Sequence, residues 1–194
     1  KDNDNLLIPL LPVEGSPTII KGYKYKKRHW RETYKDFDLP EVMNEDLAFI
    51  IGCIIGDGNY SYHNNFSFVC AENQLELLYK FKKSVIKMFN YDPIIDIQTE
   101  YKQGKNRILK TYDAQISSVV IRGFLKYIGL NYVTCRDKVI PDYFFNETIS
   151  NKGALLNGLF STDGGMTKQS GPNFTTSSEK LCIGIQNLLF CSNP

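Results

Sequence analysis

The chain has 194 residues, enough for one or two domains with a sizeable core, and its apolar content of 42% with 13% aromatic residues is typical of a folded globular protein. No apolar run reaches the roughly 18 residues that a membrane-spanning helix needs, and the N-terminal KDNDN is not a signal peptide, so we expect no membrane association and an intracellular rather than a secreted protein. The net charge of +2 does not indicate a generally basic nucleic-acid binder.

Positive charge is concentrated in residues 18–35, TIIKGYKYKKRHWRETYK, where seven Lys or Arg accompany one Glu. A solvated linker explains such a run equally well, but the interleaved aromatic residues favour a segment that contacts a phosphate backbone. We therefore expect a short strand and linker over 1–17, followed by a basic, aromatic DNA-contacting arm over 18–43. The candidate DNA-binding residues of this arm are Lys24, Lys26, Lys27, Arg28 and Arg31.

The stretch LAFIIGCIIGDG predicts a helix that begins near Leu47, is apolar on every face and ends on an acid, Asp57. Asn44, followed by Glu and Asp, supplies an N-cap and an acidic first turn. Gly52 and Gly56 lie four residues apart on one side of this helix. Interior glycine costs about 1 kcal/mol relative to alanine, so we expect a second helix to approach closely there.

The residues that follow predict alternating strands and helices. NYSYHNNFSFVCA (59–71) is typical of a hairpin, and residues 73–90 of an amphipathic helix. Residues 94–116 predict two strands around the turn QGKN, and residues 117–130 a short helix closed by Gly129. Basic side chains at or near the turn are candidates for DNA contact: Lys102, Lys105, Arg107 and Lys110.

An internal repeat relates ALLNGLFSTDGG (154–165) to AFIIGCIIGDGN (48–59) without a gap, at an offset of 106 residues. Gly158 matches Gly52 and Asp163 matches Asp57, with a small residue, Thr162, opposite the second glycine. We expect the two helices to cross through Gly52, Gly56 and Gly158 and to bring both carboxylates to one end. Two adjacent carboxylates repel each other unless a positive charge lies between them. A shared divalent cation is the simplest explanation for placing them together.

Each Asp-Gly also has a simpler interpretation, an ordinary helix-ending turn in which Gly58 and Gly164 take the left-handed conformation. A single copy would favour that turn, whereas two matched copies at a domain-sized spacing favour a shared site. The five cysteines form an odd set without CxxC spacing, so we expect reduced thiols that mostly fill the core.

These motifs carry a family resemblance. LAFIIGCIIGDG and LLNGLFSTDGG resemble the two dodecapeptide motifs of LAGLIDADG (DOD-type) homing endonucleases, in the form found in inteins. KVIPDYFF (138–145) and TTSSEKLCIGIQNLLF (175–190) agree with the same pattern, so the four blocks span 47–190. DNLLIPLLP (4–12) is also similar to the tail of an intein splicing domain.

The resemblance implies an α+β fold of two pseudo-symmetric αββαββα halves, over 44–137 and 138–194, packed through the motif helices. Each sheet would form half of a saddle over the DNA major groove. We expect the second half to be incomplete, because two strands and a helix do not follow Phe190 in the sequence.

The resemblance also implies that Asp57 and Asp163 bind Mg²⁺, with Mn²⁺ as a substitute, helped by the backbone carbonyls of Gly56 and Thr162. Lys138 matches a lysine near the scissile phosphate, although an ordinary surface lysine before the Ile-Pro turn is the alternative. Catalysis would then rest on Asp57, Asp163 and Lys138, acting on double-stranded DNA.

The function expected from the resemblance is that of a site-specific, Mg²⁺-dependent homing endonuclease encoded by an intein, which hydrolyses both DNA strands at a long asymmetric site. One alternative is a cleavage-inactive nucleic-acid-binding module. Another is an intein fragment that becomes active only when a partner chain, such as a complementary C-terminal intein fragment, completes it. We expect no self-splicing by this chain, since residue 1 is Lys rather than Cys or Ser.

Overall fold

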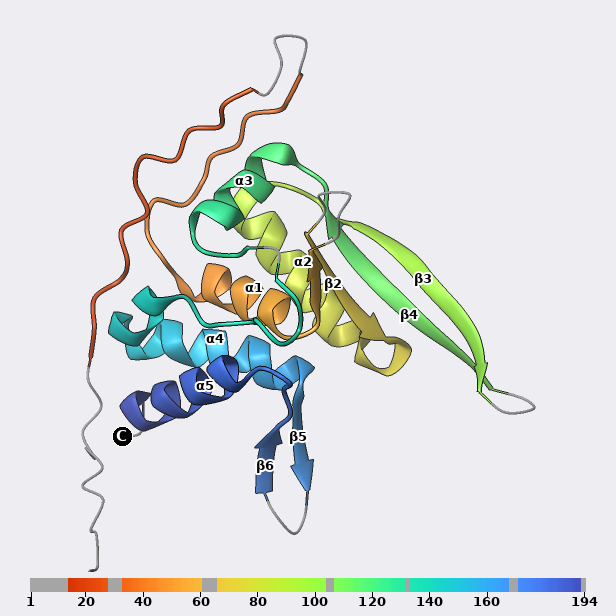
Figure 1. Ribbon diagram of the computed structural model, residues 1–194. Helices are drawn as coiled ribbons and strands as arrows, with labels where there is room; N and C mark the ends of the chain where they lie inside the picture. Colours follow the sequence, from red (N-terminus) through yellow and green to blue (C-terminus); the bar gives the residue numbers. More distant parts are fainter. Residues whose placement is uncertain are drawn as a thin grey trace, which may run out of the picture.

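The computed structural model describes residues 14–27, 33–60, 66–103, 107–131, 133–167 and 171–192 (Figure 1). The elements in chain order are α1 (Glu45–Ile55), β1 (Gly58–Tyr60), β2 (Phe66–Ala71), the 3₁₀ helix η1 (Glu72–Gln74), α2 (Leu75–Phe89), β3 (Ile94–Gln103), β4 (Arg107–Ile116), α3 (Val119–Tyr127), the 3₁₀ helix η2 (Asp142–Asn146), α4 (Ile149–Thr162), β5 (Gly164–Thr167), β6 (Gly171–Phe174) and α5 (Glu179–Ser192). The protein is thus mixed α+β, as the resemblance implied, and its sheets are antiparallel. No helix in the described part of the chain is long and apolar enough to cross a bilayer.

Helix α1 lies at the centre of the molecule, between α2 and α4 (Figure 1). Every residue from Leu47 to Ile55 is buried, which confirms the prediction of a helix enclosed on all sides. Its N-cap is also as predicted, because the Asn44 side chain accepts a hydrogen bond from the backbone N–H of Leu47 at 3.0 Å. Asp46 in the first turn accepts a hydrogen bond from Ser84 of α2 at 2.9 Å and so ties the start of α1 to its neighbour.

Beside α1 lies a four-stranded sheet in the order β1-β2-β4-β3. The amphipathic helix α2 packs against β2 and β4 with the predicted apolar face, and the rings of Phe81 and Phe68 lie 5.2 Å apart. Helix α3 adds to the same core, where Phe124 contacts Phe89 edge-to-face at 6.0 Å. The predicted stop at Gly129 is confirmed by its φ of +103°.

A second run of helix, strand, strand, helix follows, as the repeat predicted. Thr148 caps α4 by accepting a hydrogen bond from the backbone N–H of Asn151. The hairpin after α4 keeps the register of the hairpin after α1, since Gly58 pairs with Phe68 and Gly164 pairs with Phe174. Within the described residues the second sheet has two strands, β5 and β6, and α5 packs against α4 (Figure 1).

The segments before α1 run side by side as two extended chains, residues 14–27 and 33–43 (Figure 1). An isolated antiparallel bridge joins Ile19 to Val42, and the backbone N–H of Met43 donates to the carbonyl of Thr18 at 2.9 Å. The backbone N–H of Thr18 in turn donates to the buried carboxylate of Glu147 at 2.7 Å. This pair of segments is therefore attached to the start of α4.

The described tyrosine rings of the basic arm each contact another aromatic ring. Tyr23 lies against Phe124 of α3 and donates from its hydroxyl to the carbonyl of Val120. Tyr25 and Tyr34, from the two extended segments, contact each other at 4.9 Å. Removing an aromatic ring from water is favourable when its hydroxyl keeps a hydrogen-bond partner, as that of Tyr23 does. These ring contacts therefore stabilise the arm.

Candidate functional site

The two motif helices cross at their glycines. A Cβ atom added to Gly52 would lie 3.1 Å from the Cα of Gly158, and one added to Gly158 would lie 2.6 Å from the carbonyl oxygen of Phe49. One turn further on, a Cβ on Gly56 would lie 2.9 Å from the Cβ of Thr162. The backbones of α1 and α4 thus approach too closely for a side chain at Gly52 or Gly158, and at Gly56 the side chain of Thr162 fills the space.

This crossing places Asp57 and Asp163 next to each other, where the two helices end. The Gly56 N–H donates to Gly52 O at 3.0 Å, and the Asp163 N–H donates to Leu159 O at 3.1 Å. Asp57 is exposed and Asp163 is half-buried, and their carboxyl groups lie close enough to interact electrostatically. Partial burial of the carboxyl and the charge of Asp163 raise the pKa of Asp57 to about 6.

The glycines after the two acids do not take the left-handed conformation, so the simple-turn interpretation is wrong in this respect. Among the described residues, the glycines with positive φ are Gly22, Gly129 and Gly171. Gly58 is required by space instead, because a Cβ there would lie 2.6 Å from the carbonyl carbon of Ile54. Gly164 has the same constraint, with a Cβ 2.8 Å from the Cα of Phe160. After both α1 and α4, the backbone therefore passes close to the last turn of the helix that it has just left.

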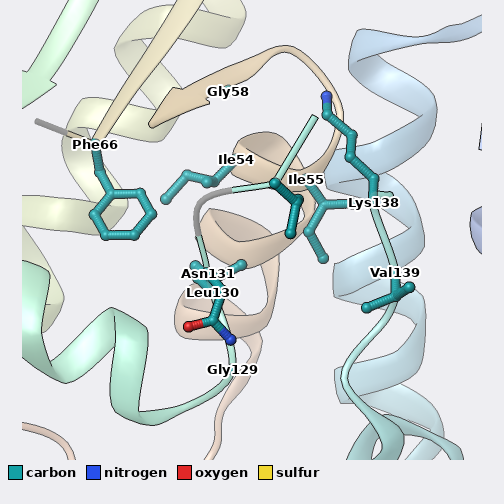
Figure 2. Close-up of a pocket in the computed structure, with 10 residues that line it drawn as sticks. Ile54, Ile55, Gly58, Phe66, Gly129, Leu130, Asn131, Lys138 and Val139 are labelled. Carbon is teal, nitrogen blue, oxygen red and sulfur yellow. The ribbon is translucent and has the colours of Figure 1, made fainter. Parts of the chain in front are cut away.

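Lys138 reaches this site from the loop that follows α3. Its side chain is half-buried, which disagrees with an ordinary surface lysine, and its Nζ donates to the carbonyl of Gly56. The positive charge lowers the pKa of Asp57 and so opposes the effect of Asp163. Figure 2 shows Lys138 beside the end of α1, at the rim of a small pocket lined by apolar side chains that include Ile54, Ile55 and Phe66.

The oxygen donors at this crossing suit a hard divalent cation. Two adjacent carboxylates are a donor set that Mg²⁺ accepts, because this cation is bound in proteins through one or two carboxylates. Within the described ranges no group of three or more His, Cys, Asp or Glu side chains is placed to hold a metal ion, so a cation at this crossing would have two carboxylates as its acidic side-chain ligands. Of the two backbone carbonyls expected to assist the metal, that of Gly56 accepts a hydrogen bond from Lys138. The residues therefore fit Mg²⁺ with Asp57 and Asp163 as the principal ligands.

The cysteines lie outside this donor set. Cys53 and Cys70 are buried free thiols, as predicted for core filler, and burial raises the pKa of both. Cys135 and Cys182 are exposed, so the expectation of buried cysteines is wrong for these two.

The predicted DNA-binding residues lie in two separate places. Three lysines of the arm are exposed, whereas Lys110 is half-buried on β4, paired in register with Glu100 of β3. The backbone places the remaining described candidates, Lys102 and Arg107, at the facing ends of β3 and β4. Arg28, Arg31 and Lys105 lie outside the described residues. The structure thus separates an arm group, Lys24, Lys26 and Lys27, from a hairpin group.

One buried residue next to Lys138 was missed by sequence reasoning. Ser178 caps α5, and its hydroxyl also donates to the backbone carbonyl of Lys138 at 2.6 Å. The pattern SSEK before an apolar run is an N-cap signal that would have identified the cap. The contact with Lys138 joins residues 40 positions apart and has no local signal in the sequence.

We expect the raised pKa of Asp57 to weaken the metal-free protein at neutral pH. A folded-state pKa of about 6 against a usual 3.8 means that the native state binds more protons than the unfolded state between these values, so stability falls as pH rises from about 4 to 6. Asp57→Asn should therefore raise the melting temperature at pH 7.5 in a chelator, by about 1–3 °C after allowance for solvent screening of this exposed residue. Thermal unfolding at pH 4 and pH 7.5 measures this. A gain that is larger at pH 4 would contradict the assignment.

Comparison with known families adds one finding. Residues 150–190 match the family model described as the LAGLIDADG-like domain. The matched segment runs from the second residue of α4, through β5 and β6, to Phe190 in α5, and it contains Asp163. This match supports a relationship to homing endonucleases and a homing-type nuclease or related nucleic-acid-binding function.

Proposed function

We propose that this protein is a site-specific, Mg²⁺-dependent DNA endonuclease of the homing type, encoded within an intein, which hydrolyses both strands of a long asymmetric site. The observation that carries the proposal is the crossing of α1 and α4 at Gly52 and Gly158, with Asp57 and Asp163 adjacent at its end. Two half-domains related by pseudo-symmetry would supply one acid each. A paired site of this kind suits two cleavage events close together on a duplex.

In this proposal Asp57 and Asp163 hold the cation through their carboxylates. Mg²⁺ would supply polarisation of the scissile phosphates and a lower pKa for the attacking water. Lys138, whose ammonium group lies by the carbonyl of Gly56, stabilises negative charge that develops on the phosphate. The close packing of α1 against α4 keeps the two acids in fixed positions, so little reorganisation is needed when DNA binds.

The test is cleavage of a randomised or genomic DNA library by the purified chain, in Mg²⁺, Mn²⁺ and Ca²⁺, with sequencing of the ends. We expect double-strand breaks at a long recurring sequence in Mg²⁺ or Mn²⁺ and none with a chelator. Cleavage that persists in the chelator, or that shows no sequence preference, would overturn the proposal.

A second candidate function is a DNA-binding chain that cuts only when a complementary C-terminal intein fragment completes it. The favouring observation is exposed apolar surface on α5, the last described helix. Three of its large apolar side chains are well exposed, namely Ile183 (48%), Leu189 (39%) and Phe190 (46%). Binding without cleavage in the library experiment, with cleavage restored by the co-expressed fragment, is the result expected from this candidate.

The exposed lysines of the arm should contribute sequence-independent affinity. Each phosphate contact adds about −0.9 to the slope of log K against log salt concentration, so Lys24→Gln with Lys26→Gln should make the slope shallower by about 2. Fluorescence anisotropy with a duplex at several salt concentrations measures this. Lys83→Gln, on the exposed outer side of α2, is the matched control and should leave the slope unchanged. An unchanged slope in the double variant would remove the arm from the DNA interface.

A further inference from the structure

We infer that Ser178 is a positioning residue for Lys138: its hydroxyl fixes the backbone of Lys138 to the N-terminus of α5 and so determines where the ammonium group lies beside the two acids. This inference rests on the proposed function for its meaning in catalysis. The contacts that carry it lie outside the pair of motif helices, and neither the repeat nor the family match assigns a role to this serine.

The Ser178 hydroxyl uses its donor and one of its acceptor positions at once. It donates to the carbonyl of Lys138 at 2.6 Å and accepts from the backbone N–H of Leu181 at 3.2 Å. The residue is 1% exposed, so water does not compete for these bonds. A buried hydroxyl that both donates and accepts a hydrogen bond restrains the relative positions of its two partners. The loop carbonyl and the first turn of α5 are therefore held at a fixed separation.

A second contact between the same two elements lies close by. Ile140, two residues after Lys138, is 4% exposed, and a Cβ atom added to Gly184 of α5 would lie 3.3 Å from its Cδ1. The segment from Lys138 to Ile140 is thus attached to α5 by one hydrogen bond and one apolar contact. Its side chain then extends to the Gly56 carbonyl at the end of α1. These contacts form a continuous path from α5 through Ser178 and Lys138 to Asp57.

The physical need for such an anchor follows from the lysine side chain. Its four-carbon stem is flexible and has many rotamers, and a displacement of about 1 Å is enough to weaken a catalytic contact considerably. An anchored backbone restricts the positions that the ammonium group can reach. Loss of the Ser178 hydroxyl should therefore affect the chemical step more than the affinity for DNA.

The experiment compares Ser178→Ala, Ser178→Gly and Ser178→Thr with Ser118→Ala, which removes the corresponding cap of α3. Ser178→Gly keeps most of the capping preference, because glycine is tolerated at an N-cap far better than alanine, so it tests the hydroxyl even where the alanine variant is unstable. We expect Ser178→Ala and Ser178→Gly to lower the single-turnover cleavage rate about 5- to 30-fold with the dissociation constant for DNA within about twofold, the pattern of an interaction made in the transition state. Ser178→Thr should restore the rate, and Ser118→Ala should leave it unchanged.

Two further measurements separate positioning from a merely structural role. In a Lys138→Met background, Ser178→Gly should cause no additional loss of rate; an equal loss in both backgrounds would overturn the inference. Independently of cleavage, the ε-methylene NMR signals of Lys138 in the DNA-free protein should shift and broaden in Ser178→Gly but not in Ser118→Ala. Unchanged Lys138 signals would overturn the inference. Absence of cleavage in the wild-type chain would count against the proposed function alone, since the NMR result does not depend on it.

Discussion

Asn substitution of either acid, Asp57→Asn or Asp163→Asn, is expected to abolish metal-dependent cleavage while DNA remains bound. Each carboxylate is half of the donor set at the helix crossing, and an amide removes the negative charge that a divalent cation needs. Loss of a cation that contributes several kcal/mol to the transition state corresponds to a rate decrease of about 10³-fold or more. The effect is measured as the single-turnover rate, in Mg²⁺, of cleaving the DNA sequence recovered from the library experiment.

Two controls keep this result interpretable. Asp142→Asn, at an exposed acid in η2, should cleave at the wild-type rate. The expected rise in melting temperature of metal-free Asp57→Asn means that its loss of activity could not be attributed to unfolding. A single variant, of either Asp57 or Asp163, that keeps cleavage within tenfold of the wild type would show that the two acids do not share one metal site.

The second large effect is expected from side chains placed at the helix crossing. Gly52→Val and Gly158→Val each force a branched side chain into the backbone of the facing helix, where even a single added Cβ is too close. Overpacking of this severity against an immobile backbone should cost about 3 kcal/mol or more, or about 6–12 °C in melting temperature for a chain of this size. Circular dichroism during thermal and urea unfolding measures the loss. Wild-type stability in either variant would contradict the close crossing.

Gly153→Ala is the matched control on the same helix. Gly153 lies in α4, one turn before the crossing, and a Cβ added there meets no atom within 4 Å. An alanine in the middle of a helix is about 0.5–1 kcal/mol more favourable than a glycine, so this variant should be more stable than the wild type. Replacement of Gly158 should lower the stability and replacement of Gly153 should raise it, although both lie in α4. This difference would show that the loss at Gly158 comes from the helix crossing and not from glycine replacement in general.

The local structure was largely predictable from the sequence. Asn44 with two following acids identified the start of α1, the apolar period identified the buried face of α2, and Gly129 identified the end of α3. Each of these signals is short-range, because capping, helical periodicity and left-handed glycine depend on neighbours within a few residues. The repeat extended the prediction to α4 and α5, since equal patterns favour equal elements.

The sequence was less informative about the aromatic arm and the two Asp-Gly turns. The aromatic residues interleaved in the basic arm favoured contact with a phosphate backbone but did not indicate their partners within the protein, which are α3 for Tyr23 and each other for Tyr25 and Tyr34. Gly58 and Gly164 suggested left-handed turns, although the constraint on them is the space above the preceding helical turn. A hydrophobic ring or a glycine fits either role locally, and only its neighbours in space distinguish them.

The sequence by itself therefore determined the elements, their order and the two acids as a matched pair. The tertiary structure alone decided that Lys138 reaches the carbonyl of Gly56 and that Ser178 anchors Lys138. Those contacts join residues 82 and 40 positions apart. Distances of that kind depend on how whole helices pack, because no propensity or periodicity of a local segment encodes the partner that a folded chain brings beside it.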